Sequence, residues 1–255
     1  MKIVVIGGTG LIGGQVVARL RAQGLEAVAA SPSTGVDTVT GAGLADALRE
    51  ATVVIDVANA PAFDAETALN FFEKSGENLL AAERDAGVRH HLALSVVGTD
   101  HLQASGYFRA KLAQEALIAR SGVPYTIVRA TQFFEFMASL ADFSTKGDVV
   151  TLMTATMQPI ASADVAAALA DLVTVAPRHG IVEIAGPEQG PLAEFVATWL
   201  GHIDDPRAVT FEASSDYFGV AVEDGTLVPG PDAWIMPTRY DDWLATAAAH
   251  HGKHR

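Results

Sequence analysis

Tyr107 and Lys111 stand four residues apart, close after the serine at position 95. If residues 107–121 form a helix, the tyrosine and the lysine share one of its faces. A phenol has an ordinary pKa of about 10, and a neighbouring ammonium lowers that pKa by favouring the phenolate. Ser95 ends a predicted strand, where its hydroxyl would hydrogen-bond a substrate oxygen that the tyrosine protonates or deprotonates. These residue types indicate acid/base chemistry on a carbonyl/alcohol pair.

The N-terminal stretch predicts a site for a phosphate-bearing cofactor. An apolar run at 3–6, typical of a strand buried on both faces, passes directly into a glycine-rich loop and then into residues with helical spacing. Gly7 suits backbone angles closed to other residues, Gly10 lets the chain approach a pyrophosphate, and Gly13 lets the helix pack closely. The first N–H groups of the helix then face the phosphates. The predicted cofactor contacts here are Gly7, Thr9, Gly10, Leu11, Ile12 and Gly13.

The loop after the second predicted strand bears on which dinucleotide is bound. At this point of such sites an acidic residue binds the adenosine ribose hydroxyls, and it would repel a 2′-phosphate. Here Ser31, Ser33 and Thr34 offer neutral hydroxyls, with neither an acid nor an arginine beside them. We therefore expect Ser31 and Ser33 to contact the cofactor and NADP(H) to be preferred, with NAD(H) as the alternative.

Strands and helices alternate along the first half of the chain. Strands are expected at 3–6, 26–30, 53–57, 92–97 and 125–128, and helices at 12–23, 44–50, 66–86 and 107–121. This alternation predicts an α/β fold with a Rossmann-type doubly wound parallel sheet. At the end of the third strand we expect Val57, Ala58 and Asn59 to line the cofactor, and Asp56 to serve packing or the cofactor edge.

The alternation becomes weaker beyond Arg129. We expect one domain over 1–255 with a small C-terminal substrate-binding lobe formed mainly by about 131–160 and 186–248. Further elements are expected as helices at 131–141 and 162–174, strands at 149–152 and 181–184, and a closing helix through Trp243 before a polar tail at 250–255. Loops after the fourth and fifth strands meet over the nicotinamide end of such sheets. The predicted substrate pocket is Val97, Gln132, Phe133 and Phe136, although the phenylalanines suit a hydrophobic core equally well.

Composition limits the classes of partner. A hydrophobic content of 49% over 255 residues is enough to bury a full core. The net charge of −13, without a basic stripe, argues against nucleic-acid binding. No apolar run reaches the roughly 20 residues that cross a bilayer, and no signal peptide is expected before the first strand. With no cysteine and no histidine or acidic residue at ligand spacing, no metal site is expected, and His90 and His91 are expected at the surface. We expect a cytoplasmic monomer or homodimer.

The motifs together resemble the short-chain dehydrogenase/reductase superfamily, and within it the atypical NmrA-like branch. The similar stretches are residues 7–13, Ser95, 107–111, 121–130, 159–166 and 183–187. The resemblance implies an NAD(P)-binding Rossmann domain in which Tyr107 is the catalytic acid/base. It also implies that Lys111 holds the nicotinamide ribose and tunes the tyrosine, and that Ser95 orients the substrate. The branch also includes redox sensors that bind the dinucleotide without turning it over.

Three functions are compatible with these features. The first is an NADP(H)-dependent oxidoreductase acting on a carbonyl, alcohol or activated double bond. Its substrate is expected to be small, neutral and largely apolar, because the predicted pocket has no clustered basic residues to pair with phosphates or several carboxylates. The second is an NADP(H)-binding regulatory protein without turnover. The third is an epimerase or lyase that uses bound cofactor transiently.

Overall fold

The structure is a computed structural model that describes residues 1–212, 217, 220–223 and 225–251. The chain divides into two compact units. The first unit comprises residues 1–129 and 165–182, and the second comprises 130–164 and 183–255. The chain therefore leaves the first unit at the end of one strand, returns to it in a helix, and leaves it again within another strand.

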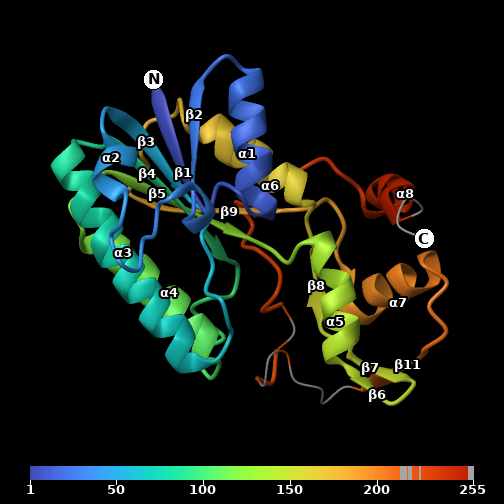
Figure 1. The fold of residues 1–255 in the computed structure, drawn as a ribbon. Coiled ribbons are helices and arrows are strands. Elements are labelled where there is room, and N and C mark those ends of the chain that lie inside the picture. The colour runs from blue at the N-terminus through green and yellow to red at the C-terminus, as the bar shows by residue number, and fades with distance from the viewer. Residues whose placement is uncertain (213–216, 218–219, 224, 252–255) are drawn as a thin grey trace. The chain divides into compact units, whose positions relative to one another are not determined.

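The main sheet has seven strands in the order β12-β9-β5-β4-β3-β1-β2 (Figure 1). Its strands are β1 (Lys2–Ile6), β2 (Glu26–Ala30), β3 (Ala51–Asp56), β4 (His90–Val96), β5 (Tyr125–Ala130), β9 (Gly180–Ala185) and β12 (Trp234–Ile235). β1 pairs in parallel with both β2 and β3, and β3 pairs in parallel with β4. The strand order reverses between β1 and β3, and sheets of this kind bind ligands at the carboxyl ends of the strands at such a reversal. The predicted doubly wound parallel sheet is confirmed.

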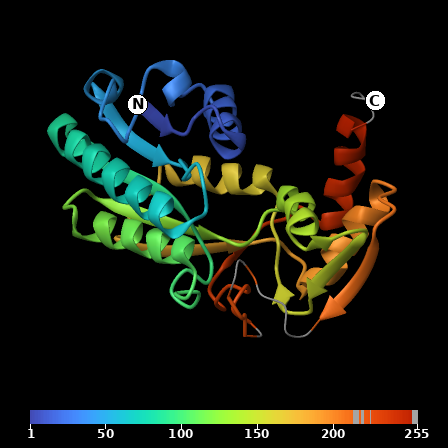
Figure 2. The same cartoon turned by 60° about the horizontal axis from the view of Figure 1, so that its bottom comes forward.

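Helices of the first unit cover both faces of this sheet. They are α1 (Leu11–Ala22), α2 (Leu44–Leu48), α3 (Ala65–Ala86), α4 (Gly106–Arg120) and most of α6 (Ser162–Leu172), with a short 3-10 helix η1 (Pro32–Thr34) after β2. α3 begins where the Asp64 carboxylate accepts a 2.9 Å hydrogen bond from Thr67 N, and it ends at Gly87, whose φ is 70°. Figures 1 and 2 show α3 and α4 side by side.

Burial on both faces explains the apolar sequence of β1. Val4 and Ile6 pack with Leu44, Leu48 and Leu79 of α2 and α3 in one buried cluster. Because side chains alternate along a strand, the equally buried Ile3 and Val5 face the opposite side, where α1 lies (Figure 1).

The second unit is built on smaller sheets and two helices that pack by their aromatic residues. Its elements are η2 (Phe134–Phe136), α5 (Met137–Phe143), β6 (Thr145–Lys146), β7 (Val149–Met153), β8 (Thr156–Met157), β10 (Gly190–Pro191), α7 (Leu192–His202), β11 (Ala208–Glu212) and α8 (Tyr240–His251). β11, β7 and β6 form one sheet, and β10 pairs with β8. Phe134 is fully buried against Tyr240 and Trp243, with ring centroids 4.9 and 5.6 Å away.

Several element boundaries differ from expectation, each for a local reason. In place of the helix expected at 131–141, the chain forms an isolated bridge between Phe133 and Ile160, followed by η2 and then by α5. The sequence analysis does not predict α7, because the surrounding segment is rich in proline. Pro191 is the N-cap residue of this helix, a position where the missing N–H breaks no helical hydrogen bond. α8 continues to His251, so the expected tail starts later, and residues 252–255 lie outside the described residues.

The expectation that His90 and His91 lie at the surface is wrong. β4 starts at His90, two residues before the expected start, and both imidazoles are buried. His90 Nε2 lies 2.9 Å from Thr126 Oγ1 on β5, and His91 Nδ1 lies 2.8 Å from Glu83 Oε1 on α3. Polar partners inside the unit, which no local pattern reveals, make this burial possible.

Candidate active site

The glycine loop lies at the strand-order reversal between β1 and β3. Gly7 has a φ of +75°, and a Cβ on it would lie 2.9 Å from Ala58 N, just beyond β3. A Cβ on Gly13 would lie only 2.2 Å from Gly7 O, so the first turn of α1 rests on the loop backbone. Thr9, Gly10 and Leu11 are exposed at the tip of the loop. The backbone angle expected of Gly7 and the close packing expected of Gly13 are present, and the resulting backbone cradle fits a dinucleotide pyrophosphate.

Hydroxyl groups tie the loop after β2 to the glycine loop. Thr9 N donates to Ser31 Oγ at 3.3 Å, and Ser33 Oγ donates to Thr9 Oγ1 at 3.4 Å. Thr34, expected to donate to a 2′-phosphate, instead gives its hydroxyl proton to the carbonyl oxygens of Ser31 and Ala29, at 2.9 and 3.2 Å. Of the three hydroxyls, Ser31 and Ser33 therefore remain the candidates for contact with the adenosine ribose.

Tyr107 begins α4 and is held by the segment that follows β3. Its hydroxyl donates a 3.0 Å hydrogen bond to Asn59 Oδ1, and its ring meets those of Phe63 and Phe72 edge-on. Burial raises the pKa of Tyr107 to about 12. The expected lowering of this pKa by Lys111 is therefore absent from the structure, where burial raises the pKa and the hydrogen bond to Asn59 acts in the opposite direction. At neutral pH the phenol is protonated and is a proton donor.

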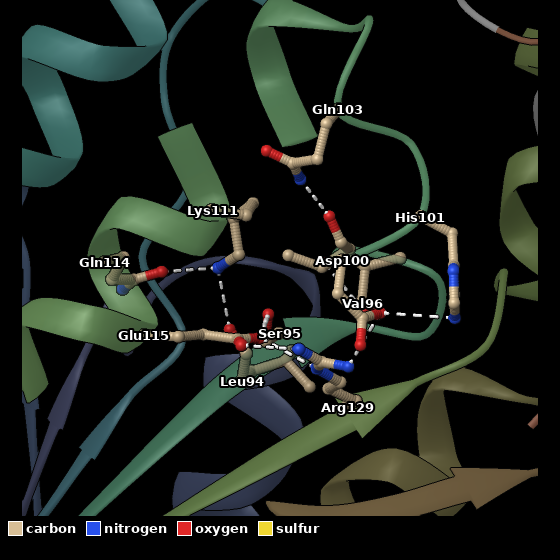
Figure 3. A network of polar contacts seen from close by, with 11 residues as sticks. Leu94, Ser95, Val96, Asp100, His101, Gln103, Lys111, Gln114, Glu115 and Arg129 are labelled. Atoms are coloured by element: carbon tan, nitrogen blue, oxygen red, sulfur yellow. Dashed lines mark hydrogen bonds and ion pairs between the residues drawn. The ribbon is translucent and has the colours of Figure 1, made fainter. Parts of the chain in front are cut away.

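Lys111 lies one helical turn further along α4, with its ammonium buried. Its Nζ donates to Leu94 O at 2.9 Å and to Gln114 Oε1 at 2.6 Å (Figure 3), and it lies 4.6 Å from the centroid of the Phe72 ring. Burial lowers the pKa of Lys111 to about 8, although the charges of Asp56 and Glu115 act in the opposite direction. The lysine therefore titrates close to neutral pH.

Ser95 lies inside a buried polar network and not at an open strand end. Its Oγ donates a 2.5 Å hydrogen bond to Glu115 Oε1, and the same carboxylate is paired through both oxygens with Arg129, at 3.0 and 2.7 Å (Figure 3). Arg129 Nη1 also lies 3.0 Å from Asp100 Oδ1 in the loop after β4. Against the cost of burial, the guanidinium holds the pKa of Asp100 below its ordinary value. For Ser95 to touch a substrate, its hydroxyl has to leave Glu115.

The residues predicted for the substrate pocket belong to different units. Val97 is buried in the first unit at the end of β4, whereas Gln132, Phe133 and Phe136 follow β5 in the second unit. Phe133 and Phe136 are half-buried, and Gln132 is 6% exposed. Within the part of the chain that the structure describes, neither Nε2 nor Oε1 of Gln132 has a hydrogen-bond partner. The role of all four in substrate binding remains a prediction.

Four residues that hold the three predicted catalytic residues or their surroundings were not expected from the sequence to do so. Asn59, expected to contact only the cofactor, holds Tyr107, while Gln114 holds Lys111. Glu115 and Arg129 hold Ser95 and the loop after β4. One signal for Glu115 was present, because it lies four residues after Lys111 on α4 and carries the opposite charge.

Comparison with known proteins agrees with this geometry. A family model described as NAD(P)H-binding matches residues 7–175, more than half of the chain. The chain belongs to the NAD(P)H-binding family. The matched range of this NAD(P)H-binding protein includes the glycine loop, Tyr107 and Lys111. No curated protein matches the sequence.

Solved structures with the same fold cover nearly the whole chain. MoeE5 in complex with UDP-glucose and NAD has a TM-score of 0.75 at 19% identity, covering 99% of both chains. The dTDP-4-dehydrorhamnose reductase of Bacillus anthracis, in complex with NADP, has a TM-score of 0.76 at 14% identity, covering 98% of this chain and 100% of its own. The Bordetella bronchiseptica enzyme WbmH, in complex with NAD+, has a TM-score of 0.74 at 13% identity, covering 99% of both chains. The resemblance drawn from the sequence is confirmed for an NAD(P)H-binding domain with this fold, and the NmrA-like branch remains a prediction.

Two further findings concern the described residues alone. The described residues include no group of three or more histidine, aspartate or glutamate side chains that could hold a metal ion. None of their helices combines the length and the apolar character needed to span a membrane.

Proposed function

We propose that the protein is an NADP(H)-dependent reductase of a carbonyl or activated double bond. The observation that carries the proposal is that Tyr107 and Lys111 share one face of α4, where Tyr107 is tethered through Asn59 to the segment after β3 and Lys111 donates to Leu94 O of β4. That segment also packs against the glycine loop, so the acid/base pair and the dinucleotide cradle meet at one end of the first unit.

Each side chain has a defined part in this proposal. A bound nicotinamide supplies the hydride. Tyr107, protonated at neutral pH, gives its proton to the substrate oxygen as negative charge develops there. Two of the three N–H donors of Lys111 already fix its position, so its third N–H would hold the nicotinamide ribose and its positive charge would stabilise the resulting phenolate. The raised pKa of the phenol favours reduction over oxidation, because oxidation requires the phenolate.

The proposed role of Ser95 differs from the substrate-orienting role expected from the sequence. Since its hydroxyl is donated to Glu115, we propose that Ser95 acts as a positioning residue for the Glu115–Arg129 pair at the end of β4. The proton transfer then depends on Tyr107 alone.

The proposed substrate is small and largely apolar. In the second unit, the half-buried Phe133 and Phe136 favour a flat or aliphatic body, and the unpaired amide of Gln132 favours one polar group that pairs with it. The solved structures with nucleotide-sugar ligands share only the fold, so nucleotide sugars form a separate arm of the test.

The proposal is tested by cofactor binding and turnover together. Fluorescence titration should show tighter binding of NADPH than of NADH, and NADPH oxidation should be followed with aldehydes, ketones, quinones, enones and nucleotide-diphosphate sugars. Tyr107→Phe should lower kcat by about 100-fold or more while leaving the Kd of NADPH within about twofold. Tyr125→Phe, which removes a phenol elsewhere in the first unit, is the control. Binding without turnover across the whole panel would favour the regulatory alternative, and unchanged turnover in Tyr107→Phe would remove this residue from the mechanism.

A further inference from the structure

A buried polar relay connects the Lys111 ammonium to the end of β3. Gln114 lies on the same helix as Lys111, and its side chain is as deeply buried. Gln114 Oε1 accepts from Lys111 Nζ at 2.6 Å, and Gln114 Nε2 donates to Asp56 Oδ2 at 3.2 Å. Asp56 Oδ1 in turn accepts from Ala58 N at 3.0 Å. The relay therefore runs from lysine to amide to carboxylate to the backbone beside the glycine loop.

The chemistry of its two ends fixes the orientation of the central amide. An ammonium only donates and an ionised carboxylate only accepts, so the amide oxygen of Gln114 must face Lys111 and its nitrogen must face Asp56. A leucine or a methionine at this position would remove one hydrogen-bond partner from each of the two charged groups. A glutamine satisfies both and adds no charge of its own.

The amide also keeps the two opposite charges apart. A carboxylate in direct contact with a buried ammonium strongly favours the charged lysine, whereas a neutral amide gives only the attraction of its dipole. The charged groups that act on Lys111 are Asp56 from β3 and Glu115 from its own helix, and Glu115 is already paired with Arg129. The Asp56 charge also acts on Glu83 of α3 and His91 of β4, in the direction that raises the pKa of each.

We propose that Gln114 is a positioning residue of the active site, whose amide orients the Lys111 ammonium and keeps it out of direct contact with the Asp56 carboxylate. The inference rests on the proposed function in one respect, namely that Lys111 serves Tyr107 in catalysis. Its electrostatic content is independent of any substrate.

The decisive variant exchanges the amide and the carboxylate. In the double variant Asp56→Asn, Gln114→Glu the net charge is unchanged, and each hydrogen bond of the relay keeps a donor and an acceptor. The carboxylate now contacts Lys111 directly. The titration of the Lys111 Cε resonance is followed by ¹³C NMR in the ligand-free protein, with the resonance assigned by its loss in Lys111→Met.

In the wild type this resonance should titrate near pH 8. In the double variant its midpoint should rise by about one unit or more. Gln114→Met, which removes the acceptor and keeps the volume, should move the midpoint down and lower kcat about tenfold with the panel substrate turned over fastest. Gln23→Met, at an exposed glutamine after α1, should change neither quantity.

The outcomes separate this inference from the proposed function. A wild-type midpoint at the ordinary value of a lysine, or equal midpoints in the wild type and the double variant, would overturn the inference. If the double variant does not fold by circular dichroism, the downward shift in Gln114→Met decides, and its absence overturns the inference. Midpoints that shift as expected while Tyr107→Phe keeps full turnover would overturn the proposed function and leave the electrostatic role of Gln114 standing.

Discussion

The Tyr107 hydroxyl donates to Asn59 Oδ1 across 3.0 Å, although 48 residues of sequence separate the two. Asn59 is exposed, whereas the side chain that it holds is packed among aromatic rings. The direction of the phenol is thereby set by the segment after β3, which also borders the glycine loop. The predicted acid/base residue and the glycine loop therefore both contact the segment after β3.

Loss of this hydrogen bond should therefore disturb catalysis more than folding. We expect Asn59→Ala to lower kcat about tenfold, because the Tyr107 hydroxyl loses the hydrogen bond that orients it. The same change should alter the free energy of unfolding by less than about 1 kcal/mol. Steady-state kinetics and urea denaturation measure the two effects. Asn78→Ala, which removes an amide bonded to Thr38 O and Val39 O, should leave kcat unchanged.

Adjacent glycines of α1 should respond oppositely to a methyl group. Gly13→Ala places a Cβ 2.2 Å from Gly7 O, so we expect the free energy of unfolding to fall by about 1–3 kcal/mol and NADPH affinity to fall more than about tenfold. Gly14→Ala meets only Gly8 O at 4.0 Å and should stabilise the helix by about 0.5–1 kcal/mol without changing affinity. Fluorescence titration with thermal unfolding compares the pair. Equal affinities in both variants would argue against the cradle.

An acid in the loop after β2 should reverse the expected cofactor preference. Ser33→Asp adds a negative charge where we expect the 2′-phosphate, so the Kd of NADPH should rise at least about tenfold while that of NADH changes little. Thr34→Val should leave the ratio of the two constants unchanged, because that hydroxyl is donated to backbone carbonyls. A Ser33→Asp protein that still prefers NADPH would place the phosphate elsewhere.

Removal of the Ser95 hydroxyl should affect stability more than chemistry. Its hydrogen bond to the buried Glu115 carboxylate is worth about 1–2 kcal/mol, which Ser95→Ala should lose in urea denaturation. We expect kcat to fall less than about tenfold. A loss above about 100-fold with unchanged stability would instead indicate that Ser95 contacts the substrate directly.

The buried His90 should make the protein sensitive to acid. Burial lowers the pKa of His90 from 6.5 to about 4, so between these values the unfolded chain binds more protons than the folded protein. The free energy of unfolding should therefore fall as the pH drops through this range, by at most about 3 kcal/mol from this group. His90→Gln should flatten the fall, measured by urea denaturation at a series of pH values. His101→Gln, which removes an exposed imidazole, should not flatten this fall.

Local spacing explains why part of the site was predictable from the sequence. Gly13 packs on Gly7, six residues before it, and Tyr107 and Lys111 are one helical turn apart, so a local sequence pattern predicts both relationships. Gln114 lies 58 residues from Asp56, and Asn59 lies 48 from Tyr107, so their partners follow only from which strands adjoin. The same limit applies to His90 and His91, whose burial depends on Thr126 and Glu83.

The division of the chain at β5 has a consequence for synthesis on the ribosome. Thr126 Oγ1 accepts from Arg178 N, 52 residues later, and Tyr125 O accepts from His179 N. Until residues 178–182 emerge, β5 is an open edge, with unpaired backbone groups that invite wrong partners. The first 129 residues already hold the glycine loop, Tyr107 and Lys111. The nascent chain thus carries the predicted catalytic residues before its main sheet is complete.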